Sequence, residues 1–305
     1  MRSMVLLCST KRGGVLGKAG TTPTYPLMAG KVRALSTAPP KFDENMARIY
    51  AHIANQHFHE NGPWPAMLAT VKEHLSRNPT GRVLDIATGP GQPGISIAQM
   101  FPEADVILSD VSEDMLTKAK DNSKDVPNAM TVIADAENLQ YGDNEFDVVS
   151  CCYGYMFCED KAKALRESYR VLKPGGVLVA TTWDKVEFLN LTKDIMRDVL
   201  GESPPAPALN PMSMHEPGMM EGLVEGAGFK DMQVTHSSYP FDMSSDPEFQ
   251  YDMVTILVKD KIAELGAEDV AKKAFEKYVS TYGKYGADRE LLVEGNTFKL
   301  TVATK

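Results

Sequence analysis

The 305-residue sequence has few cysteines and no long hydrophobic run. Its apolar stretches fall short of the roughly 20 residues that a membrane-spanning helix needs, which excludes such a helix. The cysteines lack both the paired C-x-x-C spacing of a zinc site and the dispersion of a disulfide framework. We therefore expect no metal site and reduced thiols in an intracellular compartment. The four cysteines are Cys8, Cys151, Cys152 and Cys158.

Acidic residues are missing from the start of the chain. The first acid is Asp43, whereas six basic residues precede position 36. A basic, acid-free segment rich in Ser and Thr is typical of an organelle transit peptide. We expect residues 1–40 to be a transit peptide and linker, cleaved after Leu35. The expected organelle is the mitochondrion, with the plastid as the alternative; an extension without a targeting role is the competing interpretation.

The charge of the remaining chain bears on its partners. The whole sequence carries a net charge of −9, and loss of the six early positive charges brings this to −15. Nucleic-acid binding depends on basic residues that contact phosphates. An acidic chain therefore disfavours tRNA, rRNA and DNA as substrates, and we expect a small-molecule partner.

From residue 82 onward, short apolar runs alternate with segments of helical periodicity. Branched apolar runs bounded by glycines are typical of buried parallel strands. Their alternation with helices predicts an α/β fold with helices on both faces of the sheet. The expected strands are 82–87, 105–108, 130–134, 146–151 and 177–182, and the helices among them are 95–100, 112–120 and 159–172.

The regions flanking this core are expected to be largely helical. Residues 41–80 should form a helical cap of two helices, the first starting at the N-cap Asp43 and the second after Pro65. Residues 81–184 form the expected cofactor-binding core, and 185–305 the substrate-side and closing elements. In this last region we expect helices at 217–226, 247–265 and 268–281, and strands at 232–234 and 297–303.

A glycine-rich loop follows the first expected strand. Gly89, Gly91 and Gly94 fit the pattern G-x-G-x-x-G, and Asp110 lies 21 residues beyond Gly89. Glycines in such a loop let the backbone approach a ligand closely and open the next helix, whose first N–H groups are unpaired. Taken alone, the pattern is that of a dinucleotide-binding site.

Three carboxylates distinguish this loop from an ordinary NAD site. Asp85 precedes the first glycine by four residues and favours an amine-bearing ligand over a pyrophosphate, because like charges in close proximity repel. Asp110 and Asp135 follow the next two expected strands, at the edge where α/β sheets bind ligands. Together they suit an adenosyl ligand with an amino acid tail and a sulfonium group.

The glycine-rich loop and the carboxylates belong to a larger set of motifs: Val83–Gly91 (VLDIATGPG), Ser109-Asp110, Asp135–Leu139 with Asp143–Asp147 (DNEFD), and Arg170–Gly176 (RVLKPGG). In their order and spacing, across about residues 42–240, these motifs resemble those of the class I S-adenosylmethionine-dependent methyltransferases. The general layout is similar to that of the quinone-biosynthesis methyltransferases. One departure is Ala87, where the family often has a glycine.

The resemblance implies a Rossmann-like fold, with a mostly parallel seven-stranded sheet, helices on both faces and an N-terminal helical cap. It also implies S-adenosylmethionine as the cofactor. Asp85 would then lie near the methionyl amine, Asp110 would accept both ribose hydroxyls, and Asp135 would bracket the adenine with Ala136. The other implied cofactor residues are Thr88, Gly89 and Gly91 in the loop, Met115 near the adenine, and Cys151 or Cys152 beside the methionine moiety.

The helical cap and the segment after the fourth strand are expected to contact the methyl acceptor. His57 is the expected general base, because the ordinary pKa of histidine suits proton transfer near neutrality. Tyr153 is the second catalytic candidate. The expected substrate contacts are Tyr50, Trp64, Tyr155, Met156 and Trp183.

Methyl transfer to a small molecule in an organelle is the expected function. The acceptor classes left open include quinone-ring precursors, sterol-like lipids, amines and thioethers. Two of them are named as specific alternatives: a quinone-ring precursor methylated at carbon, and a thioether acid such as methylthiohydroxybutyrate, on the route to dimethylsulfoniopropionate, methylated at sulfur. Two other functions compete with methyl transfer. One is an NAD-linked oxidoreductase, and the other is a catalytically silent protein of the same fold that serves in assembly.

Overall fold

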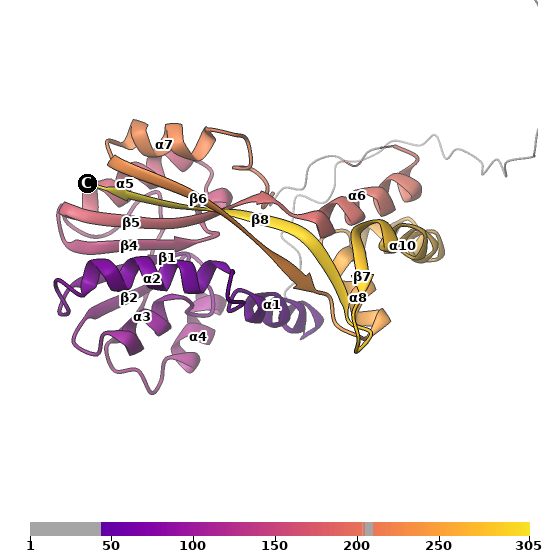
Figure 1. Ribbon diagram of the computed structural model, residues 1–305, viewed down its shortest axis with the longest axis horizontal. Coiled ribbons are helices and arrows are strands. Elements are labelled where there is room, and N and C mark those ends of the chain that lie inside the picture. Colours follow the sequence, from indigo (N-terminus) through magenta and orange to yellow (C-terminus); the bar gives the residue numbers. More distant parts are fainter. Residues whose placement is uncertain (1–43, 203, 205–209) are drawn as a thin grey trace, which may run out of the picture. The chain divides into compact units, whose positions relative to one another are not determined.

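The chain folds around one mixed sheet, shown in Figure 1 by a computed structural model. The structure describes residues 44–202, 204 and 210–305, with the backbone alone at residues 44–47, 50 and 51. The predicted leader, residues 1–40, and the predicted N-cap Asp43 lie outside the described residues. Both assignments therefore stay predictions.

Five strands form the parallel part of the sheet, in the order β3-β2-β1-β4-β5. The central strand β1 (Arg82–Ile86) pairs with β2 (Asp105–Asp110) on one side and β4 (Phe146–Cys152) on the other. β1 and β4 are almost wholly buried, as apolar strands covered on both faces must be. Because parallel strands end at the same edge, the segments after them meet there. The outer strands are β3 (Ala129–Ile133) and β5 (Leu172–Lys185).

Antiparallel strands extend the sheet beyond β5. β8 (Leu291–Thr304) lies between β5 and β6 (Lys230–Asp242), and the short β7 (Gly283–Tyr285) pairs with β8 outside this row. The predicted seven-stranded, mostly parallel sheet is confirmed in the described residues, with β7 as an additional strand. The prediction of only three residues for β6 was wrong, because the polar run Thr235–Ser238 interrupts the apolar alternation of this edge strand.

Two helices form the predicted cap, α1 (Glu44–Gln56) and α2 (Pro63–Leu75). α2 packs against β4, β5 and β8, and α1 contacts β6. The three core helices lie close to their predicted bounds, and side chains cap the starts of two of them. The hydroxyl of Ser112 accepts a hydrogen bond from the backbone N–H of Met115, as expected of an N-cap. These core helices are α3 (Gly94–Met100), α4 (Glu113–Asn122) and α5 (Lys161–Val171).

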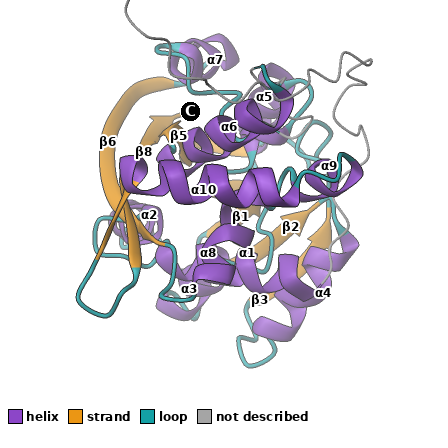
Figure 2. Ribbon diagram, turned by 90° about the vertical axis from the view of Figure 1, so that its right-hand side faces the viewer, coloured by secondary structure: helices purple, strands orange, loops and turns teal. Residues whose placement is uncertain are grey.

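The later helices depart most from prediction. α6 (Glu187–Leu200) was missed; the residue before it, Val186, provides no side-chain cap to mark its start. α6 packs against α10 (Glu268–Tyr282), which crosses in front of the sheet in Figure 2. The helix predicted at 247–265 is two helices, α8 (Pro247–Thr255) and α9 (Lys259–Glu264). The remaining ones are α7 (Met219–Ala227) and the 3₁₀ turn η1 (Tyr155–Phe157).

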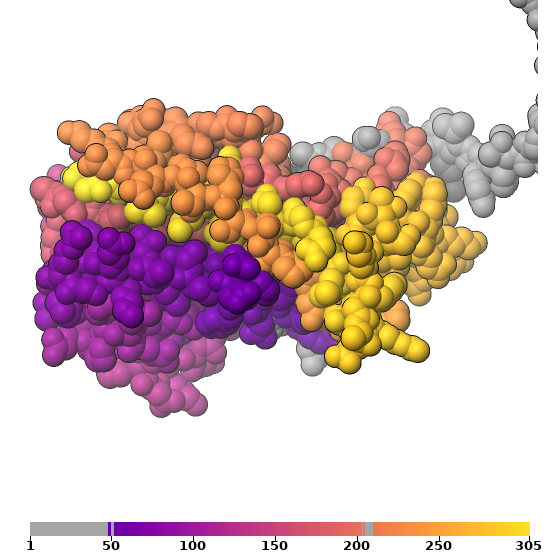
Figure 3. All heavy atoms as spheres, viewed as in Figure 1, coloured from indigo at the N-terminus to yellow at the C-terminus, as the bar shows by residue number. Residues whose placement is uncertain are grey.

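The surface view shows how the cap meets the sheet. In Figure 3 the indigo and purple atoms of α2 border the orange and yellow atoms of β6 and β8.

Among the described residues, no helix is both long and apolar enough to cross a membrane. In the same part of the chain, no group of three or more His, Cys, Asp or Glu side chains is arranged to hold a metal ion.

Candidate active site

The glycine-rich loop leaves β1 through a sequence of left-handed backbone conformations. Ala87 has φ of 53°, Gly89 of 55° and Gly91 of 110°. Glycine adopts such angles freely, whereas an L-residue with a side chain is disfavoured there by roughly 1–2 kcal/mol. Ala87, which stands where the resembling family often has a glycine, therefore strains the loop backbone. The loop is held to the sheet by the backbone N–H of Thr88, which donates to the carbonyl of Ser109.

Asp85 lies under this loop, fully buried. One carboxylate oxygen accepts from the hydroxyl of Thr88 at 2.6 Å and from the backbone N–H of Gly94 at 3.2 Å. The other accepts from the hydroxyl of Ser150 at 2.6 Å. Burial raises the pKa of Asp85 to about 6, although these hydrogen bonds act in the opposite direction. The carboxylate thus joins β1, the loop and β4, and it titrates near neutral pH.

Asp110 closes the loop from the neighbouring strand. Its carboxylate accepts from the backbone N–H of Gly89 and from that of Ser112, each at 2.9 Å. The loop and the start of α4 are therefore fixed relative to the end of β2. The next side chain, Val111, is 72% exposed. An exposed apolar side chain beside a carboxylate is suited to pack against the ring of a bound ligand. Val111 was not predicted as a site residue, although it directly follows Asp110 in the sequence.

The residues predicted around the adenine lie at the ends of β2 and β3. Asp135 is exposed, its carboxylate accepts from the backbone N–H of Glu137 at 2.8 Å, and Ala136 packs against the core. The backbone N–H of Ala134, just before them, donates to the carbonyl of Asp110, which brings the two strand ends together. Met115, partly buried on the first turn of α4, lies beyond Ser112.

The two cysteines predicted to lie beside the methionine moiety are the last two residues of β4. Cys151 is fully buried and Cys152 partly buried, with the hydroxyl of Thr181 donating to the Cys152 sulfur at 3.4 Å. Burial raises the pKa of Cys152 to about 12 and that of Cys151 well above its usual value. Both are therefore neutral thiols, suited to lining a site rather than to nucleophilic chemistry.

An aromatic cluster lies beside the ends of β4 and β5. The rings of Tyr153 and Trp183 stack at 4.1 Å with an angle of 8° between their planes. The His57 ring lies 5.2 Å from Tyr153 and 5.5 Å from Trp64. Four residues predicted from the sequence therefore come together. The fifth member, Tyr239 on β6, was missed; its hydroxyl lies 2.9 Å from Nδ1 of His57.

The reason for choosing His57 as general base was wrong. Its ring is buried and no described carboxylate pairs with it, so burial lowers its pKa to about 3. At neutral pH the imidazole is uncharged and a weak base. In this arrangement His57 serves as a hydrogen-bonding partner of Tyr239.

Two predicted substrate contacts are core residues in this structure. Tyr155 is fully buried, and its hydroxyl shares a hydrogen bond of 2.7 Å with that of Ser168 on α5. Met156 is 2% exposed. Their positions were inferred from proximity to β4, but η1 turns both side chains into the core. Tyr50 lies on α1, and its side chain is outside what the structure describes.

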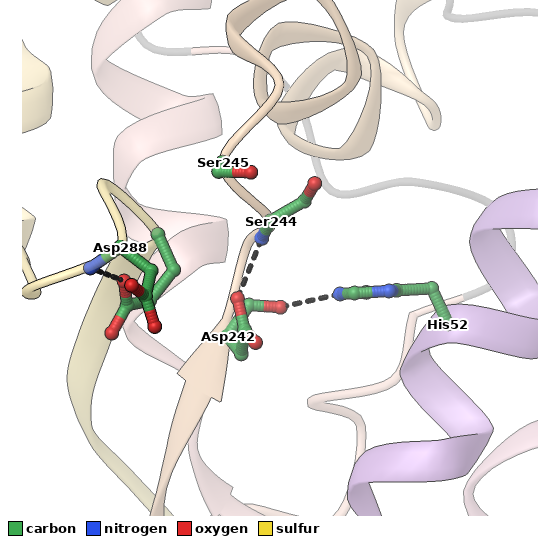
Figure 4. A pocket seen from close by; sticks show the side chains of 6 residues that line it. His52, Asp242, Ser244, Ser245 and Asp288 are labelled. Carbon is green, nitrogen blue, oxygen red and sulfur yellow. Dashed lines mark hydrogen bonds between the residues drawn. The ribbon is translucent and has the colours of Figure 1, made fainter.

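A polar hollow of about 360 Å³ lies away from the strand ends, between α1, the end of β6 and the β7–β8 connection (Figure 4). Nε2 of His52 points to the backbone carbonyl of Asp242 at 2.6 Å, and the Asp242 carboxylate accepts from the N–H of Ser244. The hollow shares no residue with the loop or the aromatic cluster. The strand-end geometry is therefore the stronger candidate for the site.

A family model for a methyltransferase domain matches residues 83–176, from β1 to the turn within β5. The chain contains a class I S-adenosylmethionine-dependent methyltransferase domain. This confirms the predicted enzyme class at the level of the domain. The matched segment holds the loop, Asp85, Asp110 and both site cysteines, whereas the helical cap and the closing strands lie outside it.

Known proteins resemble the methyltransferase domain in sequence and in fold. The ubiquinone/menaquinone biosynthesis C-methyltransferase UbiE of Rickettsia prowazekii is 37% identical over 117 residues, which are 36% of this chain and 47% of that protein. The chain thus matches about half the length of this relative. The YcgJ protein of Bacillus subtilis superposes with a TM-score of 0.51 at 18% identity, over 79% of this chain and 98% of its own.

A second solved structure covers a larger share of the chain. Phosphoethanolamine N-methyltransferase 2 of Haemonchus contortus, solved in complex with S-adenosyl-L-methionine, covers 85% of this chain and 57% of its own length. Its TM-score is 0.51 at 20% identity. Likeness at this level concerns the fold, and it confirms the predicted α/β architecture of the methyltransferase domain.

Close packing at the ends of β1 and β4 leads to a testable prediction. A Cβ atom on Gly154 would lie 2.6 Å from both the Cβ of Ala87 and the sulfur of Cys151. We expect Gly154→Ala to force these strand ends apart and to lower stability by about 1–3 kcal/mol, as overpacking does. Thermal unfolding should show a fall in Tm of about 2–4 °C for each kcal/mol.

Gly222 on α7 provides the matched control. A Cβ atom there would contact nothing within 4 Å, so Gly222→Ala should keep or raise Tm because alanine favours the helix. Equal Tm values for the Gly154→Ala variant and the unmodified protein would contradict the close packing of β1 and β4.

Proposed function

We propose that this protein transfers a methyl group from S-adenosylmethionine to a small-molecule acceptor. The observation that carries the proposal is the geometry of the strand ends. The loop, Asp85, Asp110 and the adenine-side residues meet at one edge of the sheet, in the segment that the methyltransferase model matches. The whole-protein activity and its acceptor are proposals, because the similarity to the curated relatives spans about half their length.

The residues at this edge fit the cofactor. Asp110 presents two oxygens at the mouth of the loop and is suited to the ribose diol, with the exposed Val111 beside it for the adenine. Asp85 supplies negative charge toward the amino acid part of the ligand, and the thiols of Cys151 and Cys152 supply a neutral wall. When bound, the cofactor supplies an electrophilic methyl group. The chain contributes alignment and exclusion of water.

The acceptor side is assigned to the aromatic cluster of His57, Trp64, Tyr153, Trp183 and Tyr239. It adjoins the end of β4, as the acceptor site must if it is to face the methionine end of the cofactor. Both acceptor classes suit aromatic walls: a quinone precursor offers a ring, and a thioether becomes a sulfonium cation that aromatic faces stabilise. The name of the UbiE relatives favours the former.

Calorimetric titration tests the cofactor assignment. We expect S-adenosylmethionine and S-adenosylhomocysteine to bind in the micromolar range and NAD to give no heat. Binding of NAD without a response to S-adenosylhomocysteine would overturn the proposal in favour of an oxidoreductase. Incubation with labelled S-adenosylmethionine and an organelle metabolite extract should then yield a labelled small molecule. Binding without any labelled product would favour an assembly protein.

We also propose that residues 1–40 direct the protein to an organelle. The support is the absence of acidic residues before Asp43 together with six early basic residues. A fusion of residues 1–40 to a fluorescent protein should accumulate in mitochondria, or in plastids under the alternative. A diffuse cytosolic signal from this fusion would leave the segment without a targeting role.

A further inference from the structure

The aromatic cluster contains two hydrogen-bond donors that have no partner. Trp64 is 5% exposed, and its indole Nε1 is buried with no acceptor among the described residues. The hydroxyl of Tyr153 is buried in the same condition. Buried polar groups are nearly always paired, because an unpaired one loses its bonds to water without replacement. Two such groups in one cluster therefore indicate that a bound molecule supplies the missing hydrogen-bond acceptor.

Both donors lie around the Cys152 sulfur at the end of β4. Burial raises the pKa of this thiol to about 12, while the Thr181 hydroxyl and the nearby Trp64 indole act against that rise. The hydroxyls of Tyr153 and Tyr239 lie close enough to this thiol, and to each other, for ionisation of the thiol to raise the pKa of both. Sulfur is only a weak acceptor, so it does not satisfy the indole N–H. The donors thus converge on the wall that faces the methionine end of the proposed cofactor site.

The cluster offers no counter-ion for a charged acceptor. Its ring contacts, as far as the chain is described, involve no Arg or Lys side chain. His57 is uncharged at neutral pH, since burial lowers its pKa to about 3. The nearest charge that acts on Cys152 is the carboxylate of Asp85, which is negative when ionised. An anion buried here would lose its hydration without compensation.

The two unpaired donors, Nε1 of Trp64 and the hydroxyl of Tyr153, also disfavour a positively charged methyl acceptor. An indole nitrogen can only donate, and it presents the positive end of its N–H dipole. Among the described residues, the His57–Tyr239 hydrogen bond joins two members of the cluster directly, and the Tyr239 hydroxyl lies close enough to that of Tyr153 for each to shift the pKa of the other. The Tyr153 and Trp183 rings are held by stacking.

We propose that the acceptor is an uncharged molecule with an apolar body, and that one of its oxygens accepts hydrogen bonds from Nε1 of Trp64 and the hydroxyl of Tyr153. This inference rests on the proposed methyltransferase function and narrows its substrate class. Ketones, esters and neutral phenols meet the requirement. Free carboxylates, phosphates and ammonium compounds do not, which selects against a thioether acid in its ionised form.

Intrinsic fluorescence tests the proposal directly, because Trp64 and Trp183 are the only two tryptophans in the sequence and both lie in the cluster. The probes share one ring and differ in charge: acetophenone, benzoate and benzylammonium, each titrated at saturating S-adenosylhomocysteine. We expect acetophenone to change the fluorescence saturably, and the two ions to bind at least tenfold more weakly. Tighter binding of benzoate or benzylammonium would overturn the proposal.

Two variants isolate the donors. Trp64→Phe and Tyr153→Phe should each weaken acetophenone binding about fivefold to tenfold, the loss expected for one hydrogen bond of ordinary strength. Tyr153→Phe should also keep or raise Tm, because it removes an unpaired buried hydroxyl. Tyr141→Phe is the matched control, since its hydroxyl is likewise buried without a partner but lies beside Phe146, at the opposite end of β4. That variant should leave acetophenone binding unchanged.

The affinity for S-adenosylhomocysteine, measured by calorimetry, distinguishes failure of the proposed methyltransferase function from failure of the donor assignment. If the unmodified protein does not bind S-adenosylhomocysteine, the proposed function fails. If it binds this ligand but not acetophenone, or if Trp64→Phe and Tyr153→Phe bind acetophenone as tightly as the unmodified protein, the donor assignment fails while the methyltransferase function stands. Weaker acetophenone binding in both variants, with unchanged S-adenosylhomocysteine affinity, supports the assignment.

Discussion

Replacing Asp110 with alanine is expected to weaken S-adenosylhomocysteine binding by at least about a hundredfold, because the carboxylate is the proposed acceptor for two ribose hydroxyls and each hydrogen bond to a charged group is worth about 1.5–3 kcal/mol. The variant also frees the backbone N–H groups of Gly89 and Ser112, which this carboxylate holds in place. Loss of loop order therefore adds to the loss of direct contacts. Isothermal titration calorimetry measures the change.

Two further variants show whether the effect belongs to the carboxylate. Asp110→Asn keeps one oxygen acceptor and should lose affinity to an intermediate extent. Asp114→Ala removes an exposed acid in the first turn of the same helix, α4, and should bind S-adenosylhomocysteine as the unmodified protein does. Near-normal affinity of Asp110→Ala would contradict the ribose assignment and leave this carboxylate with a purely structural role in the loop.

The loop could be predicted because its chemistry is local in the sequence. Asp85 bonds Thr88, three residues away, and Gly94, nine residues away. Ser112 caps α4 through Met115, again three residues away. Such contacts leave a short, ordered pattern, and the motif from Val83 to Gly91 carries most of it. The conformation of Ala87 is the part that the pattern concealed, since a positive φ would favour glycine there.

The acceptor side could not be predicted to the same extent, because its contacts join distant segments. Tyr239 lies 182 residues from its partner His57 and follows a polar run that interrupts the apolar alternation of its strand. Nothing near either residue indicates the other. The burial that lowers the pKa of His57 is likewise a consequence of how α1, β5 and β6 pack. Histidine was predicted as the base because of its ordinary pKa, and burial of His57 in the folded protein lowers that pKa.

The second large effect concerns Asp85 and pH. Burial raises its pKa from 3.8 to about 6, and about two pKa units correspond to about 3 kcal/mol of differential stability. Because the folded state holds the proton more tightly than the unfolded state, the stabilisation is complete below pH 3.8 and is lost as pH rises through about 6. We expect the unfolding free energy of the unmodified protein, relative to Asp85→Asn, to fall by about 2 kcal/mol between pH 4 and pH 7.

The comparison with Asp85→Asn is needed because His57 titrates in the opposite sense. Burial lowers its pKa from 6.5 to about 3, so its contribution to stability is present above pH 6.5 and is lost as pH falls toward 3. The two effects overlap in a simple pH profile. Urea unfolding of both proteins at several pH values, with the difference plotted against pH, removes the His57 term. A flat difference would show that Asp85 has an ordinary pKa in the folded protein.

The same ionisation links stability to ligand binding. An ionised Asp85 is destabilising in the free protein, yet it is the form that attracts the ammonium group of the proposed cofactor. Between pH 5.5 and 7.5 the affinity for S-adenosylhomocysteine should therefore rise about fourfold, as expected when a group with a pKa near 6 must lose its proton to bind a cation. For Asp85→Asn the affinity should be lower and independent of pH over this range. The ionised carboxylate would then lower the stability of the free protein and raise its affinity for the ligand. If the affinity of the unmodified protein did not depend on pH, Asp85 would not lie near the ammonium group of the ligand.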